Sequence, residues 1–239
     1  MDSFRYEQFC PLARATEILG HRWVMLILRE LFVGPQRFSD LRRRLPGLSS
    51  SMLTDRLAAL EGQGVVERQV LPPPAASTVY ELTPDGRALE PALLALTRWG
   101  ARFLFTSQAG DHVEPDWLGL GLAAFSSSRP TPARRFELCP YEGDRRALLR
   151  VAGGPDGTHS VDDDGPVDVR IEAPVLVVMA MMRGDLSPSD ASNLEGVTVE
   201  GEPEALAEFP LLFDFSDAAH EAASGDLRPQ PSSLKGTSP

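Results

Sequence analysis

The sequence predicts an α+β protein with two domains. With 239 residues, 42% of them hydrophobic, the chain is long enough for two modest cores. Short amphipathic helices and one hairpin make up the first part, whereas strand-like runs separated by Asp, Gly and Pro dominate the second. Residues 1–105 hold 13 basic and 11 acidic side chains, and residues 106–239 hold 10 and 23, so net charges of +2 and −13 add to −11. We therefore expect the two parts to serve different purposes.

Two helices are expected before residue 34, over residues 12–19 and 23–32. In the second, Trp23, Ile27 and Leu31 recur every four residues, which places them on one face. We interpret this face as a core-packing stripe.

A third helix is predicted from Phe38, because Phe38, Leu41 and Leu45 share one of its faces. Pro46 and Gly47 end it, since proline lacks a backbone donor and glycine tolerates left-handed dihedrals.

A fourth helix follows at once, capped by Ser49 or Ser50. Its buried stripe holds Met52 or Leu53, and then Leu57 and Leu60. Small and polar residues remain for the opposite face, where they would let the backbone come close to a partner. They are Ser50, Ser51, Thr54, Asp55 and Ala58.

A hairpin completes this part, with strands over 65–71 and 77–82 around the proline-rich tip 72–76. Two helices, a tight turn and a hairpin are the order of a winged helix-turn-helix, whose second helix enters the major groove of DNA. Helix-turn-helix pairs also occur in proteins that do not bind DNA, and an arginine run is often only a solvated face. The hairpin at this distance favours DNA binding.

Six arginines are candidates for a phosphate-binding surface: Arg37, Arg42, Arg43, Arg44, Arg56 and Arg68. Arg56 has an alternative role as an intradomain salt-bridge partner. The predicted DNA-contacting residues are Arg37, Arg43, Ser50, Ser51, Thr54 and Arg56.

From about residue 10 to 103 the chain resembles the HxlR family of bacterial winged-helix regulators. The shared pattern is Cys-Pro, Gly-x-x-Trp, Arg-Phe-x-x-Leu, Leu-x-x-Arg-Leu and Tyr-x-Leu-Thr-x-x-Gly. Here it comprises Cys10, Pro11, Gly20, Trp23, Arg37, Phe38, Leu41, Leu53, Arg56, Leu57, Tyr80, Leu82, Thr83 and Gly86. The resemblance implies a homodimer built from the N-terminal segment and the helix after the wing, on a palindromic operator. The wing tip departs from the family, which often has a charged residue there.

The helix after the wing is expected to start at Thr83 and Pro84 and to run through Phe103. Leu89, Leu93, Leu96, Trp99 and Phe103 hold one face for about four turns. A helix of this length has little left to cover in its own subunit, so dimerisation is its expected use.

Cys10 is a candidate redox sensor, because some members of the resembled family sense oxidants or electrophiles at this position. It precedes Pro11 at a helix start, with Arg14 one turn on, and such surroundings favour a thiolate. An inert, small thiol is the alternative interpretation.

The second domain is expected to begin after a linker over 106–112, with a helix over 115–125. Strands over 135–141, 145–151 and 167–171, with a short one before the last, suggest an antiparallel meander. A Met-rich helix from Ala173 to Gly184, apolar nearly all round, a strand over 197–200 and a helix over 203–213 follow. The predicted domains are 1–106 and 113–222, with a disordered tail over 223–239.

Residues 113–215 are similar to the sterol carrier protein type 2 fold. The pattern is the apolar helix, Gly-Asp-Leu-x-Pro at 184–188 and Gly-Val-x-Val-x-Gly at 196–201. The resemblance implies a mixed sheet with helices around an apolar cavity for a small hydrophobic effector. The alternative is that the Met-rich helix is only core. The candidate lining is Phe136, Leu138, Val178, Met179, Met182, Leu206, Phe209 and Phe213, with Leu148 and Val175 beside them.

Several classes of protein are disfavoured. No apolar run reaches about 18 residues, the N-terminus lacks a signal pattern, and two cysteines fit the cytoplasm. The four histidines are scattered, and an Asp run at 162–164 is more typical of a solvated turn than of a calcium loop. No phosphate-binding glycine loop or nucleophile elbow is present. Neither a metal, a cofactor nor catalysis is expected.

The expected function is a cytoplasmic transcriptional repressor whose partners are double-stranded DNA, a second copy of the chain and a small hydrophobic effector. One alternative is a hydrophobic-metabolite or lipid binding protein with a vestigial DNA-binding head. A third is an enzyme acting on a small apolar substrate.

Overall fold

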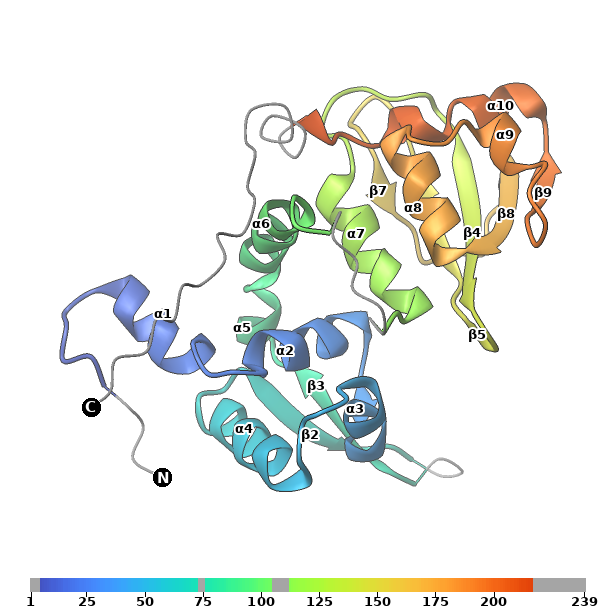
Figure 1. The fold of residues 1–239 in the computed structure, drawn as a ribbon. Coiled ribbons are helices and arrows are strands. Elements are labelled where there is room, and N and C mark those ends of the chain that lie inside the picture. Colours follow the sequence, from blue (N-terminus) through green and yellow to red (C-terminus); the bar gives the residue numbers. More distant parts are fainter. Residues whose placement is uncertain (1–4, 73–75, 105–111, 217–239) are drawn as a thin grey trace, which may run out of the picture.

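Two β-sheets, one in each half of the chain, organise the protein into two α+β domains (Figure 1). The computed structural model describes residues 5–72, 76–104 and 112–216. The wing tip at 73–75, most of the expected linker and the expected tail at 223–239 lie outside the described residues.

The N-terminal domain is a winged helix-turn-helix, as the sequence predicts. Its sheet has the order β1-β3-β2, and both pairings are antiparallel, with Arg68 opposite Tyr80. Its elements are α1 (Pro11–Leu19), α2 (Val24–Val33), β1 (Gln36–Arg37), α3 (Phe38–Arg44), α4 (Ser50–Gly62), β2 (Val66–Val70) and β3 (Thr78–Leu82).

The turn between α3 and α4 follows the local chemistry of the sequence. Gly47 adopts a φ of 90°, which side chains disfavour, and Ser49 caps α4 by accepting a hydrogen bond from the Met52 amide at 3.3 Å. Leu53 rather than Met52 begins the buried stripe, because Leu53 is fully buried and Met52 only half-buried. The cap is therefore Ser49 and not Ser50, and the buried stripe begins with Leu53.

The helix after the wing is not continuous, contrary to expectation. It divides into α5 (Pro84–Arg87), which the Thr83 hydroxyl caps, and α6 (Glu90–Ala101). Pro91 lies in the first turn of α6, where its missing N–H leaves no intrahelical bond unmade. Within α5, Gly86 is required sterically, since a Cβ there would lie 2.1 Å from the Val65 carbonyl oxygen.

The C-terminal domain consists of a mixed sheet with helices packed on it. The sheet order is β7-β6-β4-β8-β9, and β5 pairs with the end of β4. Its elements are η1 (Pro115–Trp117), α7 (Leu118–Phe125), β4 (Arg135–Glu142), β5 (Arg145–Arg146), β6 (Leu149–Ala152), β7 (His159–Ser160), β8 (Val169–Pro174), α8 (Val175–Arg183), α9 (Pro188–Ala191), β9 (Thr198–Gly201), α10 (Pro203–Ala207) and η2 (Phe209–Leu212).

The expected antiparallel meander is wrong at β8. This strand lies beside β4 and runs parallel to it, with Leu138 opposite Ile171, whereas β4, β6 and β7 pair antiparallel.

Two helices also differ from expectation. Leu176 is 64% exposed, so α8 is not buried all round. The last expected helix divides at Glu208 into α10 and η2, with Pro210 in the first turn of η2.

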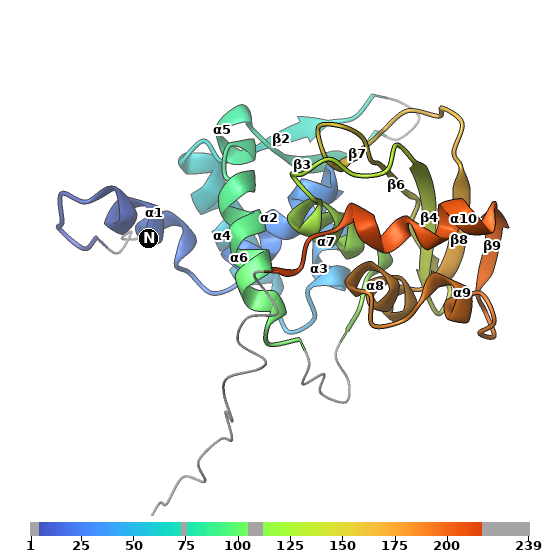
Figure 2. The same ribbon diagram turned by 90° about the horizontal axis from the view of Figure 1, so that it is seen from above.

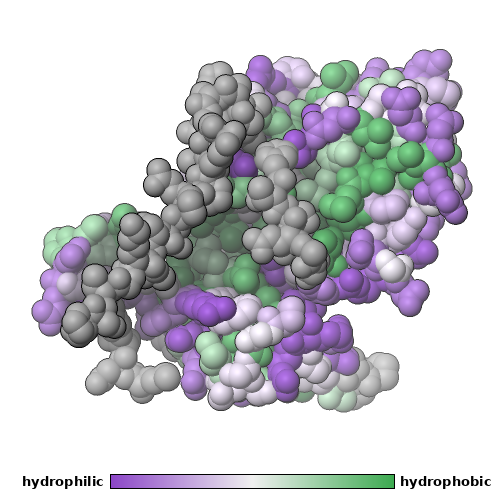
Figure 3. Space-filling model, in the orientation of Figure 1, coloured by the Kyte–Doolittle hydropathy of each residue, from purple (hydrophilic) through white to green (hydrophobic). Residues whose placement is uncertain are grey.

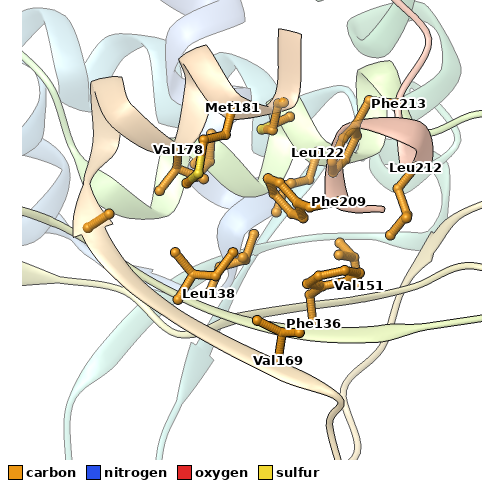
Figure 4. Packing of buried hydrophobic residues seen from close by; sticks show 14 of the residues in the cluster. Leu122, Phe136, Leu138, Val151, Val169, Val178, Met181, Phe209, Leu212 and Phe213 are labelled. Carbon is orange, nitrogen blue, oxygen red and sulfur yellow. The ribbon is translucent and has the colours of Figure 1, made fainter. Parts of the chain in front are cut away.

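The predicted cavity-lining residues form the core of this domain instead (Figure 4). Phe136, Leu138, Val178 and Phe209 are completely buried, and Met179 is partly buried against the same cluster. The Phe209 ring lies 5.1 Å from the Phe136 ring centroid and 5.2 Å from that of Phe213. Met182, Leu206 and Val175 are also buried. These side chains pack against one another in the interior of the domain.

The two domains meet along α6 and α7, which lie side by side in both ribbon views (Figures 1 and 2). Leu94 and Ala101 of α6 pack against the C-terminal core, and the Arg98 Nε donates to the Ala124 carbonyl. The expectation that α6 has little to cover within its own subunit is therefore wrong. Its other side still exposes about half of Leu96, Trp99 and Phe103.

Candidate nucleic-acid interface

The outward face of α4 carries small and polar side chains. Ser51, Thr54, Asp55 and Ala58 are exposed with the C-terminal domain in place, while Ser50 is half-buried. The Thr54 hydroxyl donates to the Ser50 carbonyl at 2.9 Å, which holds this side chain along the helix. Short side chains of this kind let a helix backbone approach base edges closely.

Three of the candidate arginines are exposed on or beside α3, the helix that precedes α4. Arg37 is exposed at the N-cap of α3, and Arg42 is exposed on α3 itself. Arg43 is 70% exposed and pairs with Asp40 at 3.0 Å. An exposed pair of this kind is weak, so Arg43 can exchange Asp40 for a phosphate at little cost. The surface over α3 and α4 is mostly polar in Figure 3, whereas apolar residues gather over α8.

Arg56 lies on the flank of α4, half-buried. Its Nε is buried without a hydrogen-bond partner, and it forms no ion pair within the described residues. The alternative role of intradomain salt-bridge partner therefore has no support among these residues.

A hollow of about 350 Å³ separates α4 from the hairpin. Arg68 stands at this hollow, beside the Tyr80 ring at 5.4 Å and 3.9 Å from Glu61. Arg68 supplies a basic group on β2, although the expected wing tip carries none. The hollow is lined by Phe38, Thr54, Leu57, Ala58, Glu61, Arg68, Thr78 and Tyr80.

Arg44 does not belong to this surface, contrary to the prediction. Its side chain is only 10% exposed and turns inward, where its Nε donates to Glu30 at 2.5 Å. Its two terminal nitrogens hold the Asp116 carboxylate at 2.7 and 2.6 Å. Burial alone would lower the pKa of Arg44, but the hydrogen bond to Asp116 and the charge of Glu30 outweigh it and raise that pKa.

Cys10 is the half-buried N-cap residue of α1. The expected cationic neighbour, Arg14, extends a terminal nitrogen to Glu17 at 2.8 Å. Arg14 therefore pairs with a carboxylate on the same helix, in an exposed contact of the weak kind.

The C-terminal domain has a surface hollow of about 240 Å³ between α7, β6 and β7. Leu148, which is 54% exposed, is the predicted ligand-site residue that lines it. The lining consists of Gly119, Leu122, Leu148, Leu149, Arg150, Ser160, Val161 and Asp162. Among the described residues, no His, Cys, Asp and Glu side chains gather in a metal-holding group, and no helix is long and apolar enough to cross a bilayer.

An exposed helix of small polar residues, a preceding helix with exposed arginines and an adjoining hairpin define a winged helix-turn-helix DNA-binding protein. The chain belongs to the HxlR-like helix-turn-helix family, whose model matches residues 18–108. It is accordingly a DNA-binding transcriptional regulator. The family model ends before the C-terminal domain.

Two relatives with this domain come from Bacillus subtilis (strain 168). The HTH-type regulator YvaP of Bacillus subtilis (strain 168) is 41% identical over 98 residues, which are 41% of this chain and 91% of that protein. YodB of the same strain is 39% identical over 95 residues, 39% of this chain and 85% of YodB. The solved reduced form of YodB matches at 36% identity with a TM-score of 0.37, covering 42% of this chain and all of that one.

Replacing Arg44 with Ala should lower the free energy of unfolding by about 3 kcal/mol. The reason is that the buried Glu30 carboxylate loses one cation and keeps only Arg29 and Trp117 as side-chain partners. Urea unfolding at pH 7 measures the change. Arg43→Ala is the matched control, because Arg43 is next to Arg44 in the chain and its side chain is exposed. We expect it to change the free energy of unfolding by less than about 0.5 kcal/mol. Equal effects of the two substitutions would contradict the buried pairing.

Proposed function

We propose that the protein is a repressor that binds a palindromic operator as a homodimer. The exposed small-residue face of α4 is the observation that carries the proposal, because it stays open while both domains are in place. The two copies of α4 would enter successive major grooves about 34 Å apart.

The roles of the side chains follow from their positions. Ser51 and Thr54 are proposed to meet base edges or nearby phosphates, and Ser50 would act beside them at the start of α4. Arg37 and Arg43 are exposed at the start and on the surface of α3, and they would bind phosphates. Arg56 has an unpartnered Nε on the flank of α4 and would reach a phosphate or the groove edge.

The dimer is proposed to form on the open side of α6. Trp99 and Phe103 pack edge to face at 5.1 Å between ring centroids, yet each is more than half exposed. The N-terminal segment adds Phe9, which is fully exposed, and Leu12, which is 72% exposed. Apolar surface of this kind favours burial against a second copy.

The C-terminal domain is proposed to sense a small hydrophobic ligand. The hollow between α7 and β6 supports this proposal, since Leu122, Leu148 and Leu149 contribute to its lining. Native mass spectrometry of the purified protein should detect a bound molecule, and a panel of extracts that adds no mass would contradict the sensing role.

Changing Ser51 and Thr54 together to Glu should reduce operator affinity at least 100-fold, because two carboxylates would face the phosphate backbone. The operator is first selected from random-sequence duplex DNA with the wild-type protein, and affinity is then measured by gel shift. Ser128→Glu places a carboxylate on the exposed surface of the other domain and should change affinity little. Wild-type affinity in the double variant would disprove the role of α4.

Trp99→Glu should convert the dimer into a monomer, since a carboxylate cannot be buried in an apolar contact without a partner. Sedimentation velocity of the full chain measures the mass. Leu176→Glu alters a similarly exposed apolar residue on α8 and should leave the dimer intact. A dimeric Trp99 variant would place the interface elsewhere.

A further inference from the structure

The C-terminal domain reaches into the DNA-binding domain through a small buried joint. Arg44 is the last residue of α3, and its guanidinium bridges Glu30 of α2 and Asp116 of η1. The Asp116 contact is bidentate, with both distances below 2.8 Å, a geometry that fixes the relative orientation of the two groups. Residues 72 positions apart in the chain are thereby held together.

Trp117 completes the joint. Its indole nitrogen donates to Glu30 at 2.9 Å, and the Arg29 guanidinium lies 3.6 Å from the centre of its ring. The Glu30 carboxylate is fully buried and accepts hydrogen bonds from Arg29, Arg44 and Trp117. A buried carboxylate is tolerated only with such partners, so the joint has one favoured arrangement.

The joint lies at the end of α3, directly before the turn that leads to α4. Arg44 is followed at once by the buried Leu45 and Leu48 and by Ser49, which caps α4. A change in the direction of the Arg44 side chain would therefore reach α4 through a turn of four residues, in which Leu45 and Leu48 are buried and the two residues between them are exposed. The C-terminal domain and α4 occupy opposite ends of the view in Figure 1, so the domain can hold α3 without covering the DNA face.

We propose that Asp116 and Trp117 are positioning residues for DNA recognition, through which the C-terminal domain holds α3 and the start of α4 in the conformation that binds the operator. The inference rests on the proposed function, since its outcome is operator binding. Both residues lie beyond residue 108, where the family model ends, so this chain supplies them from its own second domain.

The direction in which Asp116→Asn changes operator affinity distinguishes a positioning role from a general electrostatic effect. Asp116→Asn removes a negative charge, and long-range electrostatics alone would then strengthen binding to DNA. Positioning predicts the opposite, because Arg44 loses its bidentate partner and the turn before α4 loosens. Trp117→Phe is a milder second variant, since it keeps the ring beside Arg29 and removes only the donor to Glu30.

Operator affinity of the full chain is measured by fluorescence anisotropy at three salt concentrations, with Asp164→Asn as the control. Asp164 is 95% exposed and far from the joint in the sequence, so this control removes the same charge without loosening α3. We expect both joint variants to bind at least five-fold more weakly, within the range of typical coupling between sites. Their dependence on salt should match the wild type, because no phosphate contact is lost. The control should bind as tightly as the wild type or slightly better.

Amide hydrogen exchange without DNA gives an independent readout of the joint. Exchange at residues 44–48 should accelerate in both variants, while amides in the middle of α4 should keep their protection. If the wild type binds a selected operator and the variants bind it equally well, the positioning role is overturned and the proposed function stands. If the wild type binds no DNA sequence specifically, the proposed function fails, and the inference fails with it.

Discussion

The buried carboxylate of Glu30 is the constraint on which the arrangement of the two domains depends. A charge removed from water needs partners, and Glu30 draws them from its own helix, from the end of α3 and from the second domain. The interface has a polar centre, and an apolar contact along α6 and α7 accompanies it. Apolar surfaces can slide over one another, whereas a bidentate ion pair cannot. The domains are thus held in one relative orientation by interactions among five side chains.

Helix α6 connects this interface to the remaining surfaces of the molecule. One side contacts the core of the second domain, through Leu94 and Ala101, and the other exposes Trp99. The contact with the second domain and the exposed apolar surface therefore lie on opposite sides of the same twelve-residue helix. The second domain therefore contacts both α6, whose other side exposes apolar residues, and Arg44 at the end of α3, although these residues are widely separated in the sequence.

The sequence predicts the elements of the N-terminal domain well, because caps, breakers and apolar spacing are local. Ser49 and Gly47 are examples, since each acts within a few residues of its own position. Arg44 shows where local patterns fail. It is one of three consecutive arginines that periodicity treats alike, and its partner Asp116 lies beyond any sequence window. Strand order and interior volume are also non-local: alternation cannot place β8 beside β4, and Phe209 could equally have lined a cavity or filled one.

The uneven distribution of charge along the chain gives the folded protein a dipole moment. Described residues 112–216 contain 19 acidic and 8 basic side chains, and this domain lies away from α4, whereas exposed arginines lie on α3, the helix before α4. The molecule therefore behaves as a dipole in the field of a polyanion. Encounters with the acidic end toward DNA are repelled, whereas those with α4 foremost are not. An acidic protein can in this way approach DNA in a preferred orientation before any specific contact forms.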